Sequence, residues 1–431
     1  MYKNHYDAIV VGAGPSGSVA ALTLAKNNLS VALLERGKFP GSKNMFGGTI
    51  YREPTEKVFP AFWHEAPIER AVVRDEAWFM EQDSYVSVGF NGLRFAQEPY
   101  NKFTVLRSHF DKWMAGKAEQ AGAQLICNAL ARHVKFKGKK AVGVVLDDGS
   151  ELGADVVVLA EGATSLLTRE TKLRQDYTSH QFTLYVQEIL ELDSETIESR
   201  FNLEKDEGAI IGMIGYPTAG AIGKAGIWTN KNTLSIITGG YLWDLLQKGL
   251  SPYLLLQRTK QHPLVKRLIQ GAKIVQYKAH MIPKGGYNAL PKLCADGIVV
   301  VGDAAGMISG HRGTDLAMLT GAYGAQAIVQ AKAKGDFTAK TLAAYPNKVS
   351  RSFFMKDIKS AEQTVEYYHH NPDADYLLCK TLNEIGYSFF SEGLLTSQEK
   401  MQKITNIVLG VQPMPKTLLD LYKGYQHWGF L

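Results

Sequence analysis

Three glycines near the beginning of the chain have the spacing of a phosphate-binding turn. They lie in the segment Gly12–Gly17, which follows the apolar run Asp7–Val11. In such a turn Gly12 permits the tight bend, Gly14 lets a pyrophosphate approach the backbone, and Gly17 lets the following helix pack on the strand. The free N–H groups and partial positive charge at the helix N-terminus favour the same phosphates. The residues expected to line the phosphates are Gly12, Gly14, Pro15, Ser16 and Gly17.

A carboxylate follows at the distance where dinucleotide-binding folds hold a ribose. The second apolar run, Ser30–Glu35, ends in an acid about 20 residues past the glycines, and Arg36 comes next. An acid in this place hydrogen-bonds ribose hydroxyls and disfavours a 2′-phosphate, so the bound adenosine should not be that of NADP. Strand, turn, helix, strand and acid together predict a Rossmann-like domain. No second glycine fingerprint occurs in the sequence, which argues against a pyridine-nucleotide disulfide reductase.

Two later strands end in short polar motifs. The first apolar run ends in Glu161 and Gly162, and the second, which begins at Gly297, ends in Gly302 and Asp303. An aspartate at a strand end beside small residues can reach a sugar hydroxyl that lies close to the backbone. Asp303 is therefore a candidate to hydrogen-bond the ribitol chain of a flavin.

The three motifs, in this order, resemble those of the FAD-containing hydroxylase-type superfamily. The resemblance implies that one FAD is bound without a covalent link. The superfamily usually has aspartate at the position of Glu161, so the contact of this side chain is left open. It also has an arginine that helps to hold the cofactor, which here is Arg107 in the segment Arg107–Asp111. Ser108 and Asp111 predict a capping box for the next helix; the alternative is that Arg107 is an ordinary surface residue.

A loop and a helix rich in small residues follow Asp303. By the resemblance, the helix N-terminus points at the pyrimidine edge of the flavin, where its partial positive charge favours the reduced anion. Gly313 and Thr314 begin this helix. His311 and Arg312 precede it, and two interpretations stay open: they strengthen the positive field and tune the flavin, or they cap the loop.

Four further segments narrow the resemblance to one branch. They are Lys43–Tyr51, Glu65–Glu69, Thr229–Lys231 and Gly285–Pro291, and together they resemble the electron transfer flavoprotein–quinone oxidoreductase family, in its short FixC-type form. The cofactor-binding residues that motifs and resemblance predict together are Gly12, Gly14, Pro15, Ser16, Gly17, Glu35, Arg36, Lys43, Gly47, Gly48, Arg107, Glu161, Gly162, Gly302, Asp303, Gly313 and Thr314.

This resemblance implies a path for electrons. An electron transfer flavoprotein delivers them to the FAD, which passes them to a quinone, and whether that donor bifurcates electrons is left open. Such work needs no nucleophile or general base, and no catalytic side chain is assigned. Two alternatives stay open: a flavoenzyme resembling geranylgeranyl reductases, and an electron-relay subunit that meets no diffusible substrate.

The cysteines bear on a second cofactor. Cys127, Cys294 and Cys379 are the three in the chain, and no two are close in sequence. Iron–sulfur and zinc sites usually use four ligands with at least one close pair, so no metal site is expected. FixC-type chains are paired with a separate small ferredoxin-like subunit, and the resemblance implies such a partner here.

One segment departs from the family. Where its members have adjacent glycines that admit a quinone oxygen, this chain has Lys224 and Ala225 between Gly223 and Gly226. Side chains at these positions restrict the approach to the backbone. The departure leaves the identity of the quinone, and the quinone as acceptor, open.

Composition limits the other classes of function. Hydrophobic residues make up 45% and charged residues 21% of the 431, which is typical of a globular protein. The net charge of +6 includes no basic run, so nucleic acid is not an expected partner. The chain shows no signal peptide or membrane span, and the cysteines favour a reducing compartment. We expect a cytoplasmic protein that is peripheral on the inner face of the cell membrane.

The predicted fold is α/β with three parts. A Rossmann-like FAD-binding domain of the glutathione-reductase type comprises residues 1–65, 105–170 and 285–345. An inserted mixed β-sheet domain for the substrate or quinone comprises residues 66–104 and 171–284. Residues 346–431 form a helical region, with a capping box predicted at Thr396–Glu399. This region either covers the flavin domain or docks the ferredoxin-like partner or the membrane.

Overall fold

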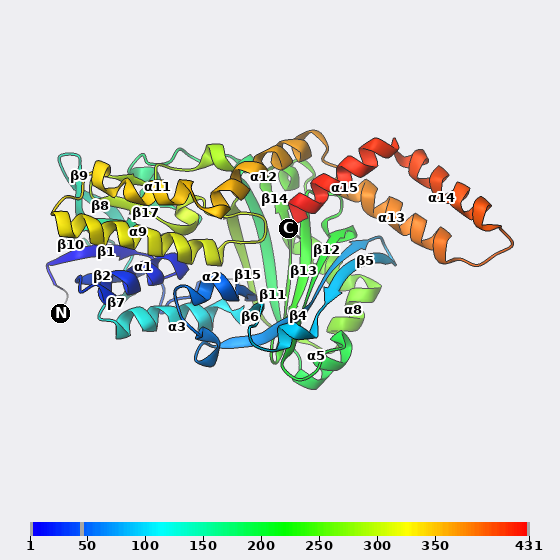
Figure 1. Ribbon diagram of the computed structural model, residues 1–431, viewed down its shortest axis with the longest axis horizontal. Helices are drawn as coiled ribbons and strands as arrows, with labels where there is room; N and C mark the ends of the chain where they lie inside the picture. The colour runs from blue at the N-terminus through cyan, green and yellow to red at the C-terminus, as the bar shows by residue number, and fades with distance from the viewer. Residues whose placement is uncertain (1–2, 44–46, 429–431) are drawn as a thin grey trace. The chain divides into compact units, whose positions relative to one another are not determined.

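The computed structural model describes residues 3–43 and 47–428. The chain folds into two compact units, and each is assembled from three segments. The first unit comprises residues 1–68, 105–181 and 281–360; the second comprises residues 69–104, 182–280 and 361–431. The predicted α/β class, with a parallel sheet, a mixed sheet and a helical C-terminal region, is confirmed (Figure 1). The finer division of the sequence into three functional domains stays a prediction.

The first unit is built on a sheet with the order β16-β17-β10-β1-β2-β7, in which β17 to β7 are parallel and β16 is antiparallel to β17. Its central strands are almost completely buried apolar runs, as expected for a sheet covered on both faces. An antiparallel hairpin, β8 and β9, extends β10 at its N-terminal end. The strands are β1 (His5–Val11), β2 (Val31–Glu35), β7 (Gln124–Cys127), β8 (Ala131–Lys137), β9 (Lys140–Leu146), β10 (Glu151–Leu159), β16 (Cys294–Ala295) and β17 (Ile298–Val300), and β3 (Gly47–Tyr51) also lies in this unit.

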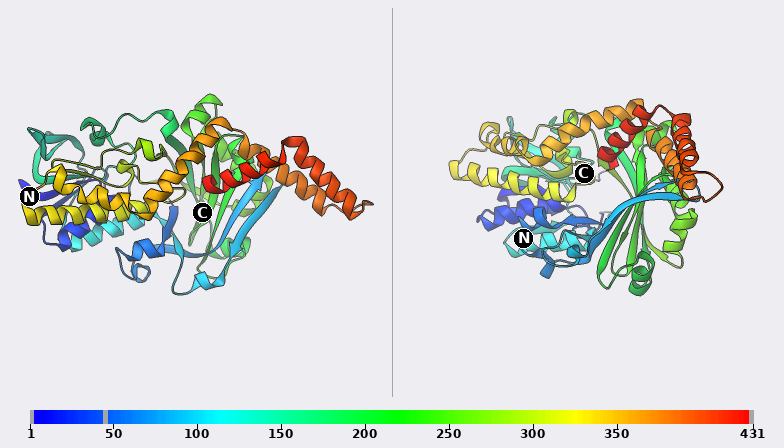
Figure 2. Two further views of the ribbon diagram at one scale, coloured as in Figure 1. Left: turned by 45° about the horizontal axis from the view of Figure 1, so that its top comes forward. Right: turned by 45° about the vertical axis from the view of Figure 1, so that its right-hand side comes forward.

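Helices α1 (Pro15–Lys26) and α9 (Thr314–Lys334) lie side by side in the first unit (Figures 1 and 2). A Cβ atom on Gly321 of α9 would lie 2.2 Å from the backbone oxygen of Ser16, so the two helices are too close there for any side chain. The remaining helical elements of the unit are α2 (Arg52–Glu56), α3 (Arg107–Gln120), α4 (Leu166–Glu170), α10 (Ala339–Leu342), α11 (Ala344–Ser350), η1 (Phe62–His64), η3 (Ser179–Gln181), η5 (Tyr287–Ala289) and η6 (Gly302–Ala305).

The second unit contains a mixed sheet with the order β15-β11-β14-β13-β12-β4-β6, and β5 pairs with β4. Alternate residues of its strands bury one face under α5, α7 and α8, which gives the period of two expected for β-structure. The strands are β4 (Ile68–Met80), β5 (Tyr85–Asn91), β6 (Lys102–Leu106), β11 (Phe182–Glu191), β12 (Glu207–Gly215), β13 (Gly223–Thr229), β14 (Thr233–Tyr241) and β15 (Lys273–Pro283). The helices are α5 (Ser194–Phe201), α6 (Leu242–Gln247), α7 (Pro252–Gln261), α8 (Pro263–Ile269), η2 (Leu93–Ala96) and η4 (Tyr216–Thr218).

The C-terminal part of the chain is helical. It comprises α12 (Phe353–His370), α13 (Ala374–Phe390), α14 (Ser397–Val411) and α15 (Met414–Trp428). The predicted capping box is confirmed at the start of α14, where Thr396 and Glu399 bond each other's backbone N–H groups. Within the described residues, no helix is both long enough and apolar enough to cross a membrane.

Candidate functional site

Two of the three glycines in the first turn are required by the fold itself. Gly12 has φ +103°, and a Cβ atom there would lie 2.4 Å from the backbone oxygen of Ala160. A Cβ atom on Gly17 would lie 1.8 Å from the backbone oxygen of Gly12. These glycines make the tight turn and the close packing of helix on strand that the sequence predicts.

Gly14 is different, because nothing in the described chain requires a glycine there. Its φ of −77° is open to any residue, and a Cβ atom would meet no described atom within 4 Å. Gly14 is also the N-cap of α1, so the free N–H groups of the helix begin at this point. The space that a side chain would fill at Gly14 therefore fits a pyrophosphate held close to the backbone.

The strand-end motif that contains Asp303 lies against this turn. Gly302 has φ +67°, and a Cβ atom there would lie 2.4 Å from the Oγ of Ser16. The N–H of Gly302 donates to Oγ1 of Thr320 in α9 at 3.1 Å. Ser16 thus meets both Gly302 and α9, and the fold brings the glycine turn, the Asp303 motif and α9 together.

Asp303 carries a carboxylate that no group among the described residues hydrogen-bonds. The side chain is partly buried, and burial raises its pKa to about 6, although the guanidinium of Arg107 lowers it. A buried carboxylate without donors is costly, and hydroxyl groups of a ligand would supply them. This acceptor beside the glycine turn fits the ribitol hydroxyls of a flavin.

Arg107 is held inside the first unit. Its guanidinium donates to Asp111 through Nε at 2.6 Å and to Oγ1 of Thr314 at 3.1 Å. Since only 15% of its side chain is exposed, the alternative of an ordinary surface residue is wrong. The predicted capping box of Ser108 with Asp111 is also wrong, because α3 begins at Arg107 with no side-chain cap. A charge-assisted pair with the arginine four residues earlier is stronger than a bond to a backbone N–H, and it takes the carboxylate.

Glu161 caps a short helix. Its two carboxylate oxygens accept from the N–H of Leu167 at 2.9 Å, and from the N–H and Oγ1 of Thr168, each at 2.7 Å. These bonds satisfy N–H groups in the first turn of α4, which have no partner within the helix. Gly162, which follows, has φ +76°, a conformation that favours glycine. The cofactor contacts predicted for both residues stay a prediction.

Glu35 lies at the expected end of β2. Its carboxylate accepts from the N–H of Gly37 at 2.6 Å and from the N–H of Ala13 at 3.4 Å, so it links the strand end to the glycine turn. Arg36 and Lys43 are exposed, whereas Gly48 is buried in β3. Gly47 begins β3, and residues 44–46 of the same predicted segment lie outside the described residues. The predicted cofactor contacts of all these residues stay a prediction.

Arg312 holds the loop before α9 in place. Its Nε donates to Asp315 at 2.7 Å, and its guanidinium lies 4.7 Å from the ring centre of Phe353 and 5.5 Å from that of Tyr51. The ring of His311 lies 5.6 Å from that of Tyr51. These contacts support the interpretation that Arg312 caps the loop, because Asp315 offsets its charge. Gly313 is the N-cap of α9, and Thr314 is its first residue.

A stacked pair near Asp303 was not predicted. The guanidinium of Arg174 lies 3.9 Å from the ring centre of Tyr177 and donates to the backbone oxygen of Thr164. The hydroxyl of Tyr177 lies 3.7 Å from where a Cβ atom on Gly306 would stand. Burial lowers the pKa of Arg174 and raises that of Tyr177. Both residues lie in an irregular segment with no motif, so the sequence offered no signal for them.

The departure at Lys224 lies in the second unit, on β13. Lys224 pairs with Gly239 of β14, and Gly239 pairs with Tyr185 of β11. Burial lowers the pKa of Lys224 to about 8. A Cβ atom on Gly239 would lie 2.1 Å from the backbone oxygen of Leu184 and 2.8 Å from the ring of Tyr185, so this glycine is required by the packing of the strands.

Residues 3–43 and 47–428 contain no cluster of three or more histidine, cysteine or acidic side chains suited to a metal. Cys127, Cys294 and Cys379 are free thiols.

Comparison with known proteins defines the class. Residues 7–169 match the sequence profile of the family described as FAD dependent oxidoreductase. A crystal structure of a geranylgeranyl bacteriochlorophyll reductase-like protein from Thermoplasma acidophilum superposes with a TM-score of 0.72, over 97% of this chain and 99% of the other. Its sequence identity of 18% shows a shared fold only. The fold and the glycine and Asp303 motifs are those of a flavin-dependent oxidoreductase that binds FAD.

Two relatives define the family. The FixC protein of Azotobacter vinelandii is 38% identical over 425 residues, which are 98% of each chain. A probable electron transfer flavoprotein-quinone oxidoreductase of Escherichia coli, YdiS, is 37% identical over 363 residues, covering 83% of this chain and 84% of YdiS. The chain belongs to the FixC family of flavoproteins, as predicted. It is a flavin-dependent oxidoreductase that takes part in electron transfer.

Proposed function

We propose that this flavoprotein accepts electrons from an electron transfer flavoprotein and passes them to a quinone. The proposal rests on its similarity, over more than four fifths of the chain, to the E. coli protein named as a probable electron transfer flavoprotein-quinone oxidoreductase. A bound flavin can take up electrons singly and release a pair, which suits transfer between a protein donor and a quinone.

The first unit supplies the groups that would hold the cofactor. The open space at Gly14 and the free N–H groups of α1 suit the pyrophosphate. The carboxylate of Asp303 suits the ribitol hydroxyls, and the N-terminus of α9 at Gly313 and Thr314 suits the flavin ring. Because Asp315 lies in the first turn of α9 and pairs with Arg312, the positive field would come mainly from the helix itself.

Three further parts of the proposal rest on family resemblance. The electron donor comprises the two subunits of an electron transfer flavoprotein, and it bifurcates electrons in some of these systems. A separate ferredoxin-like subunit carries the iron–sulfur cluster. The assembly lies in the cytoplasm against the inner face of the cell membrane.

A relay subunit without a diffusible substrate is the second candidate. It is favoured by Lys224 and Ala225 on β13, where the family resemblance implies adjacent glycines. The similarity to the geranylgeranyl reductase-like structure concerns the fold alone, so it does not indicate a substrate for this chain.

Rapid mixing tests the proposal. The complete complex, purified from its native host and reduced by its flavoprotein donor without oxygen, is mixed with a water-soluble quinone while flavin absorbance is followed. We expect the flavin to be reoxidised, with the rate rising with quinone concentration. If quinone leaves the flavin reduced in the complete complex, the relay function replaces the proposed one. The iron content of the same preparation tests for the separate cluster subunit.

A further inference from the structure

The turn between α13 and α14 carries large apolar side chains on the protein surface. We call residues Phe389–Leu395 the apolar tip; it lies at one end of the α13–α14 hairpin (Figure 1). Leu394 is 106% exposed and Phe390 is 81% exposed, and Phe389 and Leu395 are more than half exposed. Single apolar side chains on a surface are ordinary, but four together in one turn indicate a binding surface.

The hairpin that carries the tip is firmly attached to the second unit. Leu378 and Cys379 of α13 are buried against residues of β4 and β12. Asn383 donates to the backbone oxygen of Phe79 at 2.9 Å and accepts from Ser84 at 2.8 Å. The tip begins six residues beyond Asn383, so it lies about 9 Å past these contacts along the helix axis.

The turn at the tip is also held in shape. The capping box of Thr396 and Glu399 fixes the start of α14, and Lys400 approaches Glu392 at 3.7 Å. The rings of Phe389 and Phe390 pack edge to face, with centres 5.0 Å apart. The apolar side chains are therefore presented by an ordered turn, and binding would cost little conformational entropy.

Along the hairpin, an apolar tip is followed by lysines, and in a lipid leaflet the acyl chains are followed by phosphate groups. Glu392 is the one charged residue of the tip. Lys403 lies about 10 Å behind the start of α14, and Lys380 about 15 Å behind Phe390, by the rise of an α-helix. Apolar side chains at this end and lysines behind them match acyl chains and phosphate groups, since lysine can extend its ammonium to the head groups.

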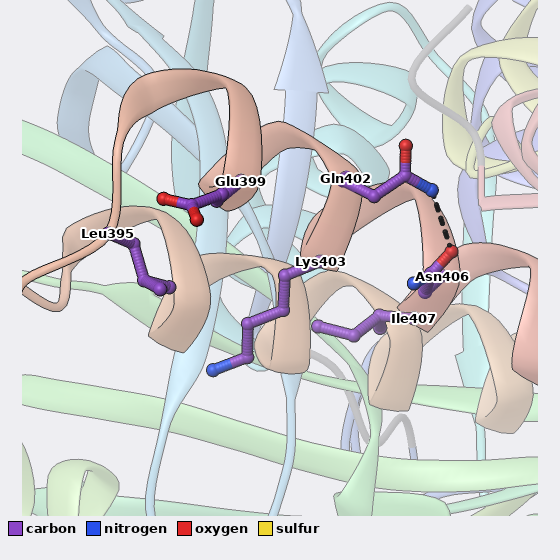
Figure 3. Close-up of a pocket in the computed structure, with 6 residues that line it drawn as sticks. All are labelled: Leu395, Glu399, Gln402, Lys403, Asn406 and Ile407. Carbon is purple, nitrogen blue, oxygen red and sulfur yellow. Dashed lines mark hydrogen bonds between the residues drawn. The ribbon is translucent and has the colours of Figure 1, made fainter.

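The shape of the surface favours lipid over a protein partner. A projecting turn needs a matching pocket on a protein, whereas a bilayer accepts it without one. The hollow beside the tip is lined by Leu395, Glu399, Gln402, Lys403, Asn406 and Ile407, so charged and amide side chains stand among its apolar ones (Figure 3). Gln402 donates to Asn406, one turn further along α14, at 3.0 Å.

We propose that the apolar tip inserts into the outer part of one bilayer leaflet, with Phe390 and Leu394 deepest and the lysines behind it at the phosphate groups. Lys403 and Lys380 are balanced by Glu399 and Glu384 on the same helices, so the insertion is driven by apolar burial. The inference gives the peripheral membrane contact a location, and it does not depend on a quinone as the acceptor.

Flotation of the full-length holoprotein with lipid vesicles tests this. One set of vesicles is phosphatidylcholine alone and the other contains phosphatidylglycerol as well. We expect the protein to float with both sets at physiological salt. The double variant F390S/L394S should bind at least tenfold more weakly. The matched control L246S/L254S removes two leucines of α6 and α7 that are 66% and 64% exposed, and it should bind like the wild type.

Three results would overturn the inference: no flotation of the wild type, equal flotation of F390S/L394S, or binding to the anionic vesicles alone that salt reverses. Thermal unfolding of each variant shows that the fold is intact. As a second readout, tryptophan fluorescence of the variant Phe390→Trp should shift to the blue with phosphatidylcholine vesicles, and no shift also counts against insertion. A protein that floats but fails to reduce quinone would end the proposed function and leave this inference standing.

Discussion

Replacing Asp303 by asparagine should make the cofactor-free protein more stable and its flavin less tightly bound. The carboxylate is partly buried, and none of the described residues hydrogen-bonds it. Asparagine has nearly the same shape but no charge to desolvate. Asp303 therefore destabilises the cofactor-free fold, and it also supplies the hydrogen-bond acceptor for the cofactor. Functional groups in binding sites often have both effects.

The size of the effect follows from the pKa. Burial raises the pKa of Asp303 from 3.8 to about 6, against the opposing effect of Arg107. One pKa unit corresponds to about 1.4 kcal/mol, so the charged form destabilises the fold by at most about 3 kcal/mol. Because the side chain is partly exposed, screening reduces this, and we expect about 1.5–3 kcal/mol at pH 7.

The direction of the pKa shift determines the pH range in which Asp303 destabilises the fold. Below about pH 4 the carboxyl is protonated in the folded and the unfolded chain, and the penalty is absent. Between about pH 4 and pH 6 the unfolded chain loses this proton first, so the free energy of unfolding falls as the pH rises. Above about pH 6 the penalty is complete. The stability gain of Asp303→Asn should therefore be small at pH 4 and full at pH 7.

Thermal and urea unfolding of the cofactor-free proteins measures the stability term, and titration with FAD measures the affinity. We expect Asp303→Asn to unfold at higher urea concentration at pH 7, and to bind FAD more weakly by about 1.5–3 kcal/mol. Asp148→Asn is the control, because that aspartate is exposed and lies outside the site. A variant that is less stable than the wild type at pH 7, or that keeps full FAD affinity, refutes the reasoning.

Three further predictions follow from single residues. Gly14→Val should lose FAD but keep its circular dichroism and unfolding temperature, because a Cβ atom there meets no described atom within 4 Å; a destabilised variant contradicts this. Lys224→Met should stabilise the fold by about 1–3 kcal/mol at pH 7. Burial lowers the pKa of Lys224 from 10.5 to about 8, so the gain is full below about pH 8 and is lost above 10.5, as unfolding at the two pH values would show. Arg70→Met should cost about 3–5 kcal/mol in urea unfolding, since it leaves several buried acceptors without their donor.

The parts of the site that the sequence predicted are those with local causes. Gly12 is required by its φ of +103°, Gly17 is required by a contact with Gly12 in the same turn, and Asp303 follows directly from a buried strand. A motif of neighbouring residues fixes such geometry almost alone. The sequence could also predict the capping box at Thr396, because both partners lie in one helical turn.

The parts that it missed depend on competing or distant partners. The carboxylate of Asp111 had two partners within reach in sequence, the backbone N–H groups of α3 and the guanidinium of Arg107, and spacing does not rank them. Arg174 and Tyr177 take their places from packing in an irregular segment, which leaves no periodic trace. Where two local bonds compete, charge and burial in the folded chain decide between them.

Arg70 links two of the segments that indicated the family branch, Glu65–Glu69 and Thr229–Lys231. This arginine, which follows Glu65–Glu69, has a fully buried side chain. Its Nε donates to the backbone oxygen of Asn230 at 2.7 Å, and its NH2 group donates to that of Lys231 at 3.0 Å. Glu69 accepts from the N–H of Lys231 at 3.0 Å. One segment therefore holds the other in place.

These contacts limit what the two segments indicate about the electron acceptor. They are partners in one buried network within the second unit, where Arg70 also bonds Glu198, Ser194 and the backbone of Glu207. A network of this kind holds both segments in the fold, whatever the electron acceptor is. The choice of acceptor would then depend on residues outside the network. Lys224 is one candidate, because the family resemblance places glycine there. Replacing Lys224 by glycine should change the rate with quinone while Arg70 and its partners keep the fold intact; an unchanged rate would move the acceptor site away from β13.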